Sequence, residues 1–226
     1  MPAHSLVRIP KHLSFEEAAT LPCAAVTAWN GLYGIPTSAL RAGQWVLAEG
    51  TGGVSALAIQ IAVAAGAHAI ITSSSDDKLE KVKQSIPQAY RHLFHGINYK
   101  TVPNWGEEAY KLTGGVGVDH VIEVGGPGTL EQAFAACKKG AHISNIGFVA
   151  GGDQPNMPLN VLAKRAIYRG IFVGSRELFQ DLNTVLEAHP DIHPLIDRVF
   201  DFKDAVKAYE YQWSAAHVGK VIIRVN

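Results

Sequence analysis

The sequence has few of the features that mark secreted, membrane or nucleic-acid-binding proteins. It contains only two cysteines, Cys23 and Cys137, which lie far apart without the spacing of a metal site. We therefore expect a reducing compartment and no disulfide framework. The 20 lysine and arginine residues balance 20 aspartate and glutamate residues. Because these charges cancel, nothing favours nucleic acid or an anionic membrane as a partner.

Long hydrophobic runs are also absent. Residues 1–10 have no apolar core of the signal-peptide type, and the longest apolar stretch is interrupted too often to span a bilayer. We therefore predict a cytoplasmic protein without a membrane partner. The chain does have sufficient length, because 226 residues, 47% of them hydrophobic, can bury a sizeable core.

The most informative segment is residues 45–65, in which an apolar run, a tight glycine turn and a helical apolar pattern follow one another. Because glycine lacks a Cβ, Gly50 allows a sharp exit from a strand, and Gly52 lets a pyrophosphate approach the amides at a helix start. Ser55 takes the third small position of the G-x-G-x-x-G/A pattern. The segment predicts a nucleotide-binding strand, turn and helix, the alternative being an ordinary glycine-rich turn.

Short apolar runs and helical segments alternate along most of the chain, which is typical of a parallel sheet covered on both faces. The predicted strands are 46–49, 68–73, 98–99, 118–124, 142–146 and 170–173. The predicted helices are 54–65, 76–84, 105–112, 130–137 and 161–167. Six such strands favour an α/β fold with a doubly wound parallel sheet, the Rossmann fold.

The two ends of the chain depart from this alternation. Ser14 and the two glutamates that follow Phe15 predict a helix start, and Pro22 is expected to interrupt that segment. At the other end, a strand at 198–200, a helix at 204–213 and a strand at 220–225 form a closing unit.

Several motifs in a fixed order resemble the medium-chain dehydrogenase/reductase superfamily, especially its quinone-oxidoreductase-like and zinc-type alcohol-dehydrogenase-like members. These are residues 13–22 (LSFEEAATLP), 27–29 (TAW), the glycine turn, 117–119 (GVD) and 217–223 (HVGKVII). The resemblance implies hydride transfer between a nicotinamide cofactor and a small carbonyl, alcohol, quinone or enone.

Members of this superfamily normally begin with roughly a hundred or more residues of a β-rich catalytic domain, and this chain matches from near the end of it. We expect a remnant of that domain with a linking helix at 1–28, a Rossmann domain at 29–175, and closing helices and a strand at 176–226. The expected function is an NADP(H)-dependent oxidoreductase. The alternatives are a catalytically degenerate or truncated cofactor-binding module and a fragment of a longer gene product.

The resemblance also implies which residues meet the cofactor. The glycine turn would hold the pyrophosphate, Thr27 would lie near the nicotinamide, later strand ends would line the cleft, and Lys220 would approach the phosphates. The residues concerned are Thr27, Gly50, Gly52, Gly53, Val54, Val124, Gly125, Ile146, Gly147, Phe148, Phe172, Val173 and Lys220. The alternatives are a helix hydroxyl for Thr27, core positions for Ile146 and Val173, and a solvated strand end for Lys220.

Residues 72–75 (TSSS) bear on the choice of cofactor, because an NAD site usually has Asp or Glu about twenty residues after the turn. The hydroxyls of Ser73 and Ser74 can donate to a 2′-phosphate, and Lys78 adds a positive charge one helical turn further on. We therefore predict NADP(H) over NAD(H). The alternative is that the serines only cap the helix beginning at Asp76, whose charge opposes a phosphate.

Metal ligands and a general acid are harder to find. Cys23 falls where zinc-dependent relatives place a catalytic ligand, but no four-cysteine lobe is present and its partner ligands are missing. We expect no zinc and a free, buried helix cysteine at Cys23. Tyr33, Tyr168 and Tyr211 qualify as general acids by residue type alone, so the catalytic residues stay unknown.

Residues 170–174 (GIFVG) bear on assembly. Dimers of the superfamily often pair the last strand of the nucleotide fold with its twin, and this short apolar segment resembles that strand. A bare apolar edge strand would also invite association. We therefore expect a homodimer through the segment from Gly170 to Gly174, the alternative being a buried strand.

Overall fold

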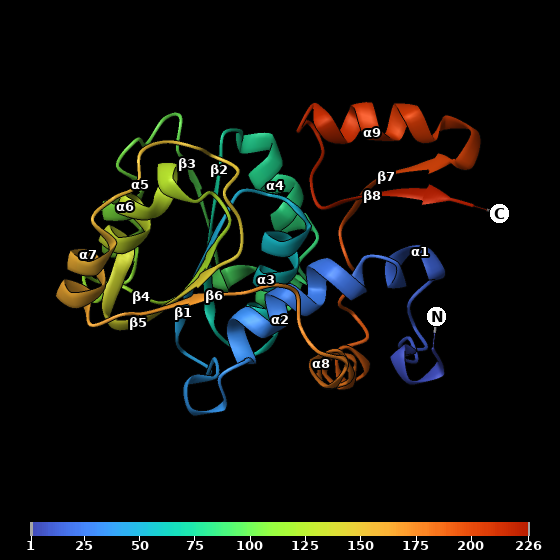
Figure 1. Ribbon diagram of the computed structural model, residues 1–226, viewed down its shortest axis with the longest axis horizontal. Helices are drawn as coiled ribbons and strands as arrows, with labels where there is room; N and C mark the ends of the chain where they lie inside the picture. Colours follow the sequence, from blue (N-terminus) through green and yellow to red (C-terminus); the bar gives the residue numbers. More distant parts are fainter. Residues whose placement is uncertain (1, 226) are drawn as a thin grey trace.

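The computed structural model describes residues 2–225, and its centre is a six-stranded parallel sheet (Figure 1). The strands are β1 (Trp45–Glu49), β2 (His68–Ser73), β3 (Phe94–Asn98), β4 (Val118–Glu123), β5 (Cys137–Asn145) and β6 (Ile167–Gly170). They lie in the order β3-β2-β1-β4-β5-β6, and every neighbouring pair is parallel. This is the strand order of doubly wound dinucleotide-binding folds, so the predicted fold class is confirmed.

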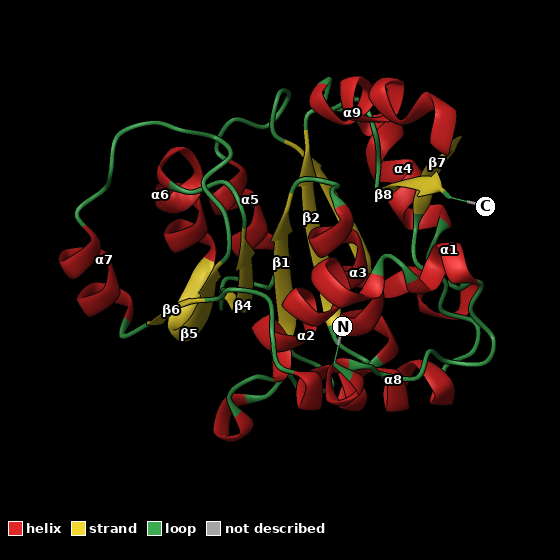
Figure 2. Cartoon of the chain, turned by 45° about the vertical axis from the view of Figure 1, so that its right-hand side comes forward, coloured by secondary structure: helices red, strands yellow, loops and turns green. Residues whose placement is uncertain are grey.

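Helices cover both faces of the sheet (Figure 2). They are α1 (Phe15–Ala18), α2 (Val26–Tyr33), α3 (Gly53–Ala64), α4 (Asp76–Gln84), α5 (Trp105–Leu112), α6 (Pro127–Ala136), α7 (Met157–Lys164), α8 (Arg176–Ala188) and α9 (Ala205–Trp213). Because side chains alternate along a strand, Val46 and Ala48 of β1 pack with α2, α3, α4 and α8, whereas Leu47 packs with α5 and α6. None of the helices in residues 2–225 combines the length and apolarity needed to cross a membrane.

The C-terminal unit stands beside the main sheet and contains α9 and two parallel strands, β7 (Ile196–Asp201) and β8 (Lys220–Arg224) (Figure 1). It meets the glycine turn directly, because the Gly219 N–H donates to the Thr51 carbonyl oxygen at 2.8 Å. Gly219 also forms an isolated parallel bridge with Gly52. The last strand of the chain therefore starts at the turn that follows the first strand of the sheet.

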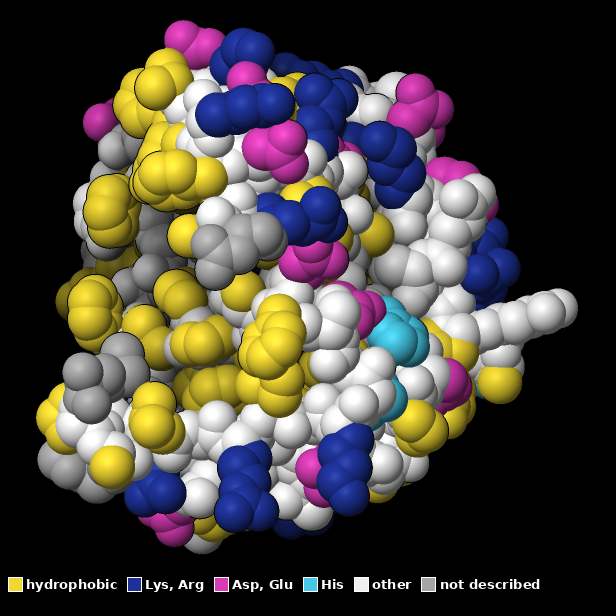
Figure 3. All heavy atoms as spheres, turned by 90° about the vertical axis from the view of Figure 1, so that its right-hand side faces the viewer, with side chains coloured by type: hydrophobic (Ala, Val, Ile, Leu, Met, Phe, Trp, Pro, Cys, Tyr) yellow, Lys and Arg dark blue, Asp and Glu magenta, His cyan; other side chains and the backbone are white. Residues whose placement is uncertain are grey.

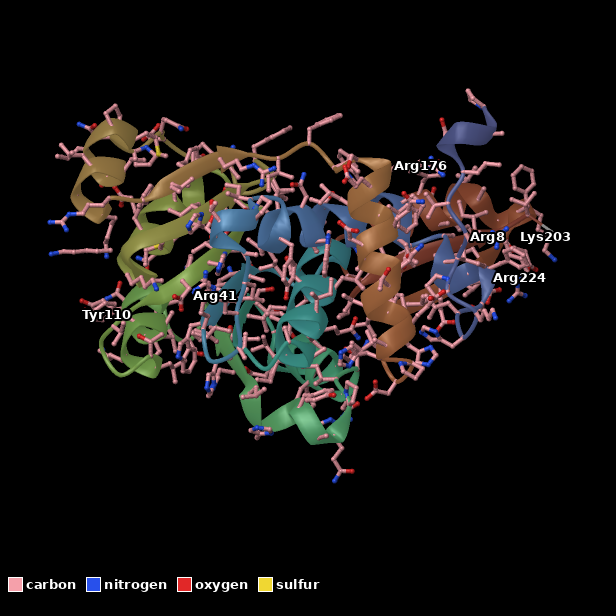
Figure 4. The ribbon with its side chains drawn as sticks, turned by 90° about the horizontal axis from the view of Figure 1, so that it is seen from below. Arg8, Arg41, Tyr110, Arg176, Lys203 and Arg224 are labelled. Atoms are coloured by element: carbon pink, nitrogen blue, oxygen red, sulfur yellow. The ribbon has the colours of Figure 1, made fainter. Side chains whose placement is uncertain are left out.

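The N-terminal segment packs on α8, a helix outside the predicted ones. Asn183 donates from Nδ2 to the Arg8 carbonyl oxygen at 2.8 Å, and Arg8 and Arg176 border the same hollow (Figure 4). The signals for α8 are present in the sequence: Ser175 caps the helix by accepting from the Leu178 N–H. Its buried Leu182 and Leu186 are four residues apart, which is helical spacing.

The predicted helix at 161–167 and the predicted strand at 170–173 are both wrong in their bounds. Asn156 caps α7 and Pro158 lies in its first turn, so the helix starts at Met157 and ends before Arg165, whose φ is 51°. Strand β6 therefore begins at Ile167 and ends at Gly170. The segment Gly170 to Gly174 expected as an edge strand is mostly a loop, because Val173 has a φ of 56°, which is outside the β region.

Smaller differences have local causes. Strand β3 occupies 94–98 rather than 98–99. Cys137 opens β5 instead of closing α6, because its backbone is extended and it pairs with Val118 of β4. Pro22 does not interrupt its segment: it lies in the first turn of a π-helical stretch, Leu21–Ala25, that runs on into α2. The predicted domain limits at residues 28 and 175 stay a prediction.

Candidate dinucleotide-binding site

The glycine turn between β1 and α3 is open on its outer side. Gly50 has a φ of 69°, which favours glycine, and Gly52 is the N-cap of α3. Within residues 2–225, no side chain caps this helix, and no non-neighbouring heavy atom lies within 4 Å of a Cβ built on Gly50 or Gly52. The first amides of α3, with the positive end of the helix dipole, therefore face free space that an anionic group can enter.

Two hydroxyl groups form hydrogen bonds with the backbone of this turn. Ser55, at the third small position of the pattern, is buried and donates to the Glu49 carbonyl oxygen at 2.6 Å. Thr72, at the end of β2, accepts from the Gly50 N–H at 3.4 Å. Serine at position 55 is thus compatible with close packing of α3 on β1 and adds a hydrogen bond. The supporting role of Thr72 was missed because it depends on the pairing of β1 with β2.

Lys220 lies against the first residue of α3. A Cβ on Gly53 would collide with Cδ of Lys220 and would lie 3.3 Å from Cβ of Ala24. The side chain of Lys220 therefore crosses the start of the helix, close to where phosphate groups are expected. The C-terminal unit supplies this residue through the start of β8, so it is more than a solvated strand end.

The residues at the end of β2 have different environments. Ser73 is buried, and its hydroxyl accepts from the Ser75 N–H at 3.3 Å, whereas Ser74 is exposed. The Ser75 hydroxyl caps α4 by accepting from the Lys78 N–H. Lys78 donates from Nζ to the Ala215 carbonyl oxygen at 2.6 Å. Ser74 and Lys78 are thus the more accessible members of the predicted group, and Ser73 serves local structure.

The loops after β4 and β5 are tied together beside the turn. The Val124 and Gly125 N–H groups both donate to Oε2 of Glu49, at 3.2 and 3.1 Å. The Ile146 N–H donates to the Glu123 carbonyl oxygen at 2.8 Å, and Gly147 packs on the Val124 backbone. Phe148, by contrast, is 84% exposed. The structure therefore gathers most of the predicted strand-end residues at the carboxyl edge of the sheet, with Phe148 projecting from it.

Near α2 the predicted contacts are partly engaged in internal hydrogen bonds. The Thr27 hydroxyl donates to the Cys23 carbonyl oxygen at 2.7 Å, which is the helix-hydroxyl alternative. The Val173 carbonyl oxygen accepts from Nδ2 of Asn30 at 2.7 Å. Phe172 is 97% exposed. The Thr27 hydroxyl proton and one lone pair of the Val173 carbonyl oxygen are therefore already used within the protein.

Cys23 is exposed, so the expected buried position is wrong. It lies in the π-helical stretch Leu21–Ala25, whose buried residues are Leu21, Ala24 and Ala25. Among residues 2–225, no three His, Cys, Asp or Glu side chains are placed to hold a metal ion. The described residues therefore do not by themselves fit a zinc site, and no step below is derived through zinc.

The pKa values of all three candidate tyrosines are raised. Burial raises the pKa of Tyr33, which stacks on Trp29 at 4.1 Å. Burial, then the negative charges of Glu123 and Glu49, raises the pKa of Tyr168. A hydrogen bond to Asp197 raises the pKa of Tyr211. A higher pKa makes each phenol a weaker proton donor near neutral pH, so the structure singles out none of them.

Comparison with known proteins identifies the family. The model of the zinc-binding dehydrogenase family matches residues 53–188, which begin at the first residue of α3 and end with α8. The chain belongs to the zinc-binding dehydrogenase family. This confirms the resemblance to medium-chain dehydrogenases predicted from the motifs.

Individual relatives agree with this family. The chain is 52% identical over 230 residues to a zinc-type alcohol dehydrogenase-like protein of Schizosaccharomyces pombe, an alignment that covers 100% of the chain and 64% of that protein. A putative alcohol dehydrogenase from Sinorhizobium meliloti superposes with a TM-score of 0.87 at 36% identity, and a structure described as an NAD-dependent alcohol dehydrogenase with 0.86 at 30%. Each superposition covers 100% of this chain and 63% of the other. This zinc-binding dehydrogenase family chain thus spans less than two thirds of these relatives.

Proposed function

We propose that the chain binds a nicotinamide dinucleotide across the carboxyl edge of its six-stranded sheet and serves as the cofactor-binding part of an oxidoreductase. The substrate class we propose is a small carbonyl, alcohol, quinone or enone. The observation that carries the proposal is the open glycine turn, where Gly50 and Gly52 leave the first amides of α3 facing free space. Membership of the zinc-binding dehydrogenase family supports it.

The residues present fit such a cofactor. The amides at the start of α3 would bind the pyrophosphate, and Lys220 would add a positive charge there. When bound, the nicotinamide gives or takes the hydride. The chain's own part is to orient it: the backbone after β4, at Val124 and Gly125, and after β5, at Ile146 and Gly147, would border its ribose and ring.

We further propose NADP(H) rather than NAD(H) as the preferred cofactor. Exposed Ser74 follows β2, and Lys78 lies one helical turn further on. The Lys78 ammonium is already hydrogen-bonded to Ala215, so a 2′-phosphate would bind beside that contact or replace it. One related structure is described as NAD-dependent, which makes the preference a matter for direct titration of both cofactors. Tighter binding of NADH than of NADPH would refute it.

A second candidate function is cofactor binding without turnover. It is favoured by the raised tyrosine pKa values and by the exposure of Cys23, because within residues 2–225 no tyrosine is singled out as an acid and no three side chains are placed to hold a metal ion. Calorimetric titration with NADPH, followed by addition of small quinones and enals, separates the two. Saturable binding with NADPH oxidation supports the oxidoreductase, binding alone supports the second function, and no binding refutes both.

We also propose a homodimer through β6, at the edge of the sheet. A hollow of about 660 Å³ lies beside this strand and α7, and its lining is mainly apolar, from Met157 and Val161 to Leu162 and Ile167. Leu162 is 74% exposed and Ile167 is 45% exposed. Pairing of β6 with its twin would cover these side chains. Sedimentation that finds only a monomer at micromolar concentration would refute the dimer.

A further inference from the structure

Two buried carboxyl groups lie next to each other under the candidate cofactor cleft. Strands β1 and β4 are neighbours, and Ala48 pairs with Ile122. The next residues, Glu49 and Glu123, therefore stand side by side at the carboxyl ends of the two strands. Glu49 is 3% exposed and Glu123 is 0% exposed. Neither residue belongs to the predicted site, although both stand directly before predicted site residues in the chain.

Each carboxyl group uses one oxygen to hold the loop between β4 and α6. Oε2 of Glu49 accepts from the Val124 and Gly125 N–H groups. Oε1 of Glu123 accepts from the Gly126 N–H at 2.7 Å and from the Thr129 hydroxyl at 2.6 Å. Three backbone donors from the loop and one hydroxyl from the first turn of α6 thus converge on two carboxyl groups, and the loop cannot move without breaking several of these bonds.

The second oxygen of each carboxyl group does not take part in these hydrogen bonds. Within the described residues, Oε1 of Glu49 and Oε2 of Glu123 are buried and have no other hydrogen-bond donor. Two adjacent buried carboxylates cannot both be ionised at moderate cost, whereas one proton between them supplies the missing hydrogen bond. Burial, then the charge of Glu123 and a hydrogen bond with it, raises the pKa of Glu49 well above its ordinary value.

Among the described residues, Tyr168 of β6 and Cys137 of β5 respond to the charge of this pair. Burial and the charges of Glu123 and Glu49 raise the pKa of Tyr168. Burial raises the pKa of Cys137 to about 12, the charge of Lys164 lowers it and that of Glu49 raises it. Lys164 is the cation on this side, and its ammonium group already donates to the Cys137 carbonyl oxygen at 2.7 Å. A proton held between the two carboxyl groups would remove their mutual repulsion.

We propose that Glu49 and Glu123 share a single proton and that this carboxyl pair positions the loop between β4 and α6 for cofactor binding. Both are positioning residues, since they act through the backbone of Val124, Gly125 and Gly126. The effect on the cofactor rests on the proposed function, whereas the shared proton does not.

Loss of the proton should loosen the loop. With a second negative charge, the two carboxylates repel and one of them must turn away from its backbone donors. Because the folded pKa of Glu49 lies above its unfolded value, the stability it contributes is complete below the unfolded pKa and is lost as pH rises through the folded one. The affinity for NADPH should fall over the same pH range, by about tenfold.

The test uses the full chain with Glu49→Gln, Glu123→Gln and the double variant. In either single variant the amide oxygen can accept the backbone donors and the NH₂ group can replace the shared proton. Each single variant should therefore fold and show an affinity for NADPH that no longer falls as the pH rises. In the double variant two NH₂ groups face each other, so its stability should fall far more than the sum of the single effects. The exposed Glu131→Gln is the control.

Infrared spectroscopy of the cofactor-free protein reports on the proton itself. A carbonyl stretch of a protonated buried carboxyl group should be present at neutral pH in the wild type and in Glu131→Gln, and absent from both single variants. Its absence from the wild type, or additive effects in the double variant, overturns the shared proton.

Cofactor titration distinguishes the two proposals. If the infrared band and the non-additive stability appear but NADPH does not bind, the carboxyl pair stands and the proposed function fails. If NADPH binds with the same pH profile in the wild type and Glu49→Gln, the positioning role is overturned while the proposed function stands.

Discussion

All six residues of β4 are buried, whereas β7, which the structure describes in full, has no buried residue. The same contrast separates the helices: nine of the twelve residues of α3 are buried, but Ala208 is the one buried residue of the fully described α9. On the face shown in Figure 3, hydrophobic side chains gather toward the left and charged ones toward the top. The six-stranded sheet therefore carries its own core, while the C-terminal unit presents apolar side chains such as Val206 and Trp213 at its surface.

The largest difference between the two regions is expected from truncation of apolar side chains. Ile70→Ala removes a fully buried side chain from β2 and should cost about 4 kcal/mol of unfolding free energy. Val206→Ala, in α9, removes a side chain that is 71% exposed and should change it by less than about 0.5 kcal/mol. Urea unfolding measures both. Equal losses would show that the C-terminal unit is as well packed as the sheet.

The sheet should also be the acid-sensitive region. Burial, then the neighbouring His142, lowers the pKa of His120 from 6.5 to about 4. Because the folded pKa is depressed, the stabilisation by neutral His120 is present above pH 6.5 and is lost as pH falls toward 4. His120→Phe lacks the titrating imidazole, so over this pH range it should lose about 3 kcal/mol less unfolding free energy than the wild type.

Exposed His92 provides the control for this experiment. His92→Phe should follow the wild-type pH profile in urea unfolding. A wild-type profile that is flat between neutral and mildly acidic pH would contradict the prediction.

A smaller loss of stability than at Ile70 or His120, and the most selective functional effect, is expected at the glycine turn. Gly50 and Gly43 have φ values of 69° and 77°, and a Cβ on either would meet open space. Alanine at either position should therefore cost about 1 kcal/mol through backbone strain alone. Only Gly50→Ala should also weaken NADPH binding, because its Cβ enters the space proposed for the phosphates. Equal affinities of the two variants in calorimetry would argue against the site.

Much of the fold could be predicted because short-range patterns decide it. Helices α3 and α4 were predicted to within a residue, since Gly52, Ser75 and the apolar spacing mark their starts. The end of the sheet was misplaced because residues 171–173 are as apolar as a strand. In the structure this segment is held by a long-range contact, the hydrogen bond from Asn30 to the Val173 carbonyl oxygen, which joins residues 143 positions apart.

The same difference between local and long-range interactions applies to the candidate site. The glycine turn is local in sequence and was predicted from it, and the structure finds it open. Strand pairing brings Thr72, Glu49 and Glu123 to their partners. In the sequence each is only a polar residue at the end of an apolar run, so its role could not be predicted. The family resemblance pointed to residues at the strand ends, and their role stays a prediction; it could not show that the hydroxyl of Thr27 is already donated to the Cys23 carbonyl oxygen.

The hydrogen bond between Gly219 and Thr51 has a consequence for the order of folding. It joins two residues that lie far apart in the sequence. Because closing a long loop costs chain entropy, contacts between distant residues form more slowly than local ones. The β1 strand and its turn should therefore form before Gly219 and Lys220 reach them, and the phosphate-facing turn should be completed late in folding.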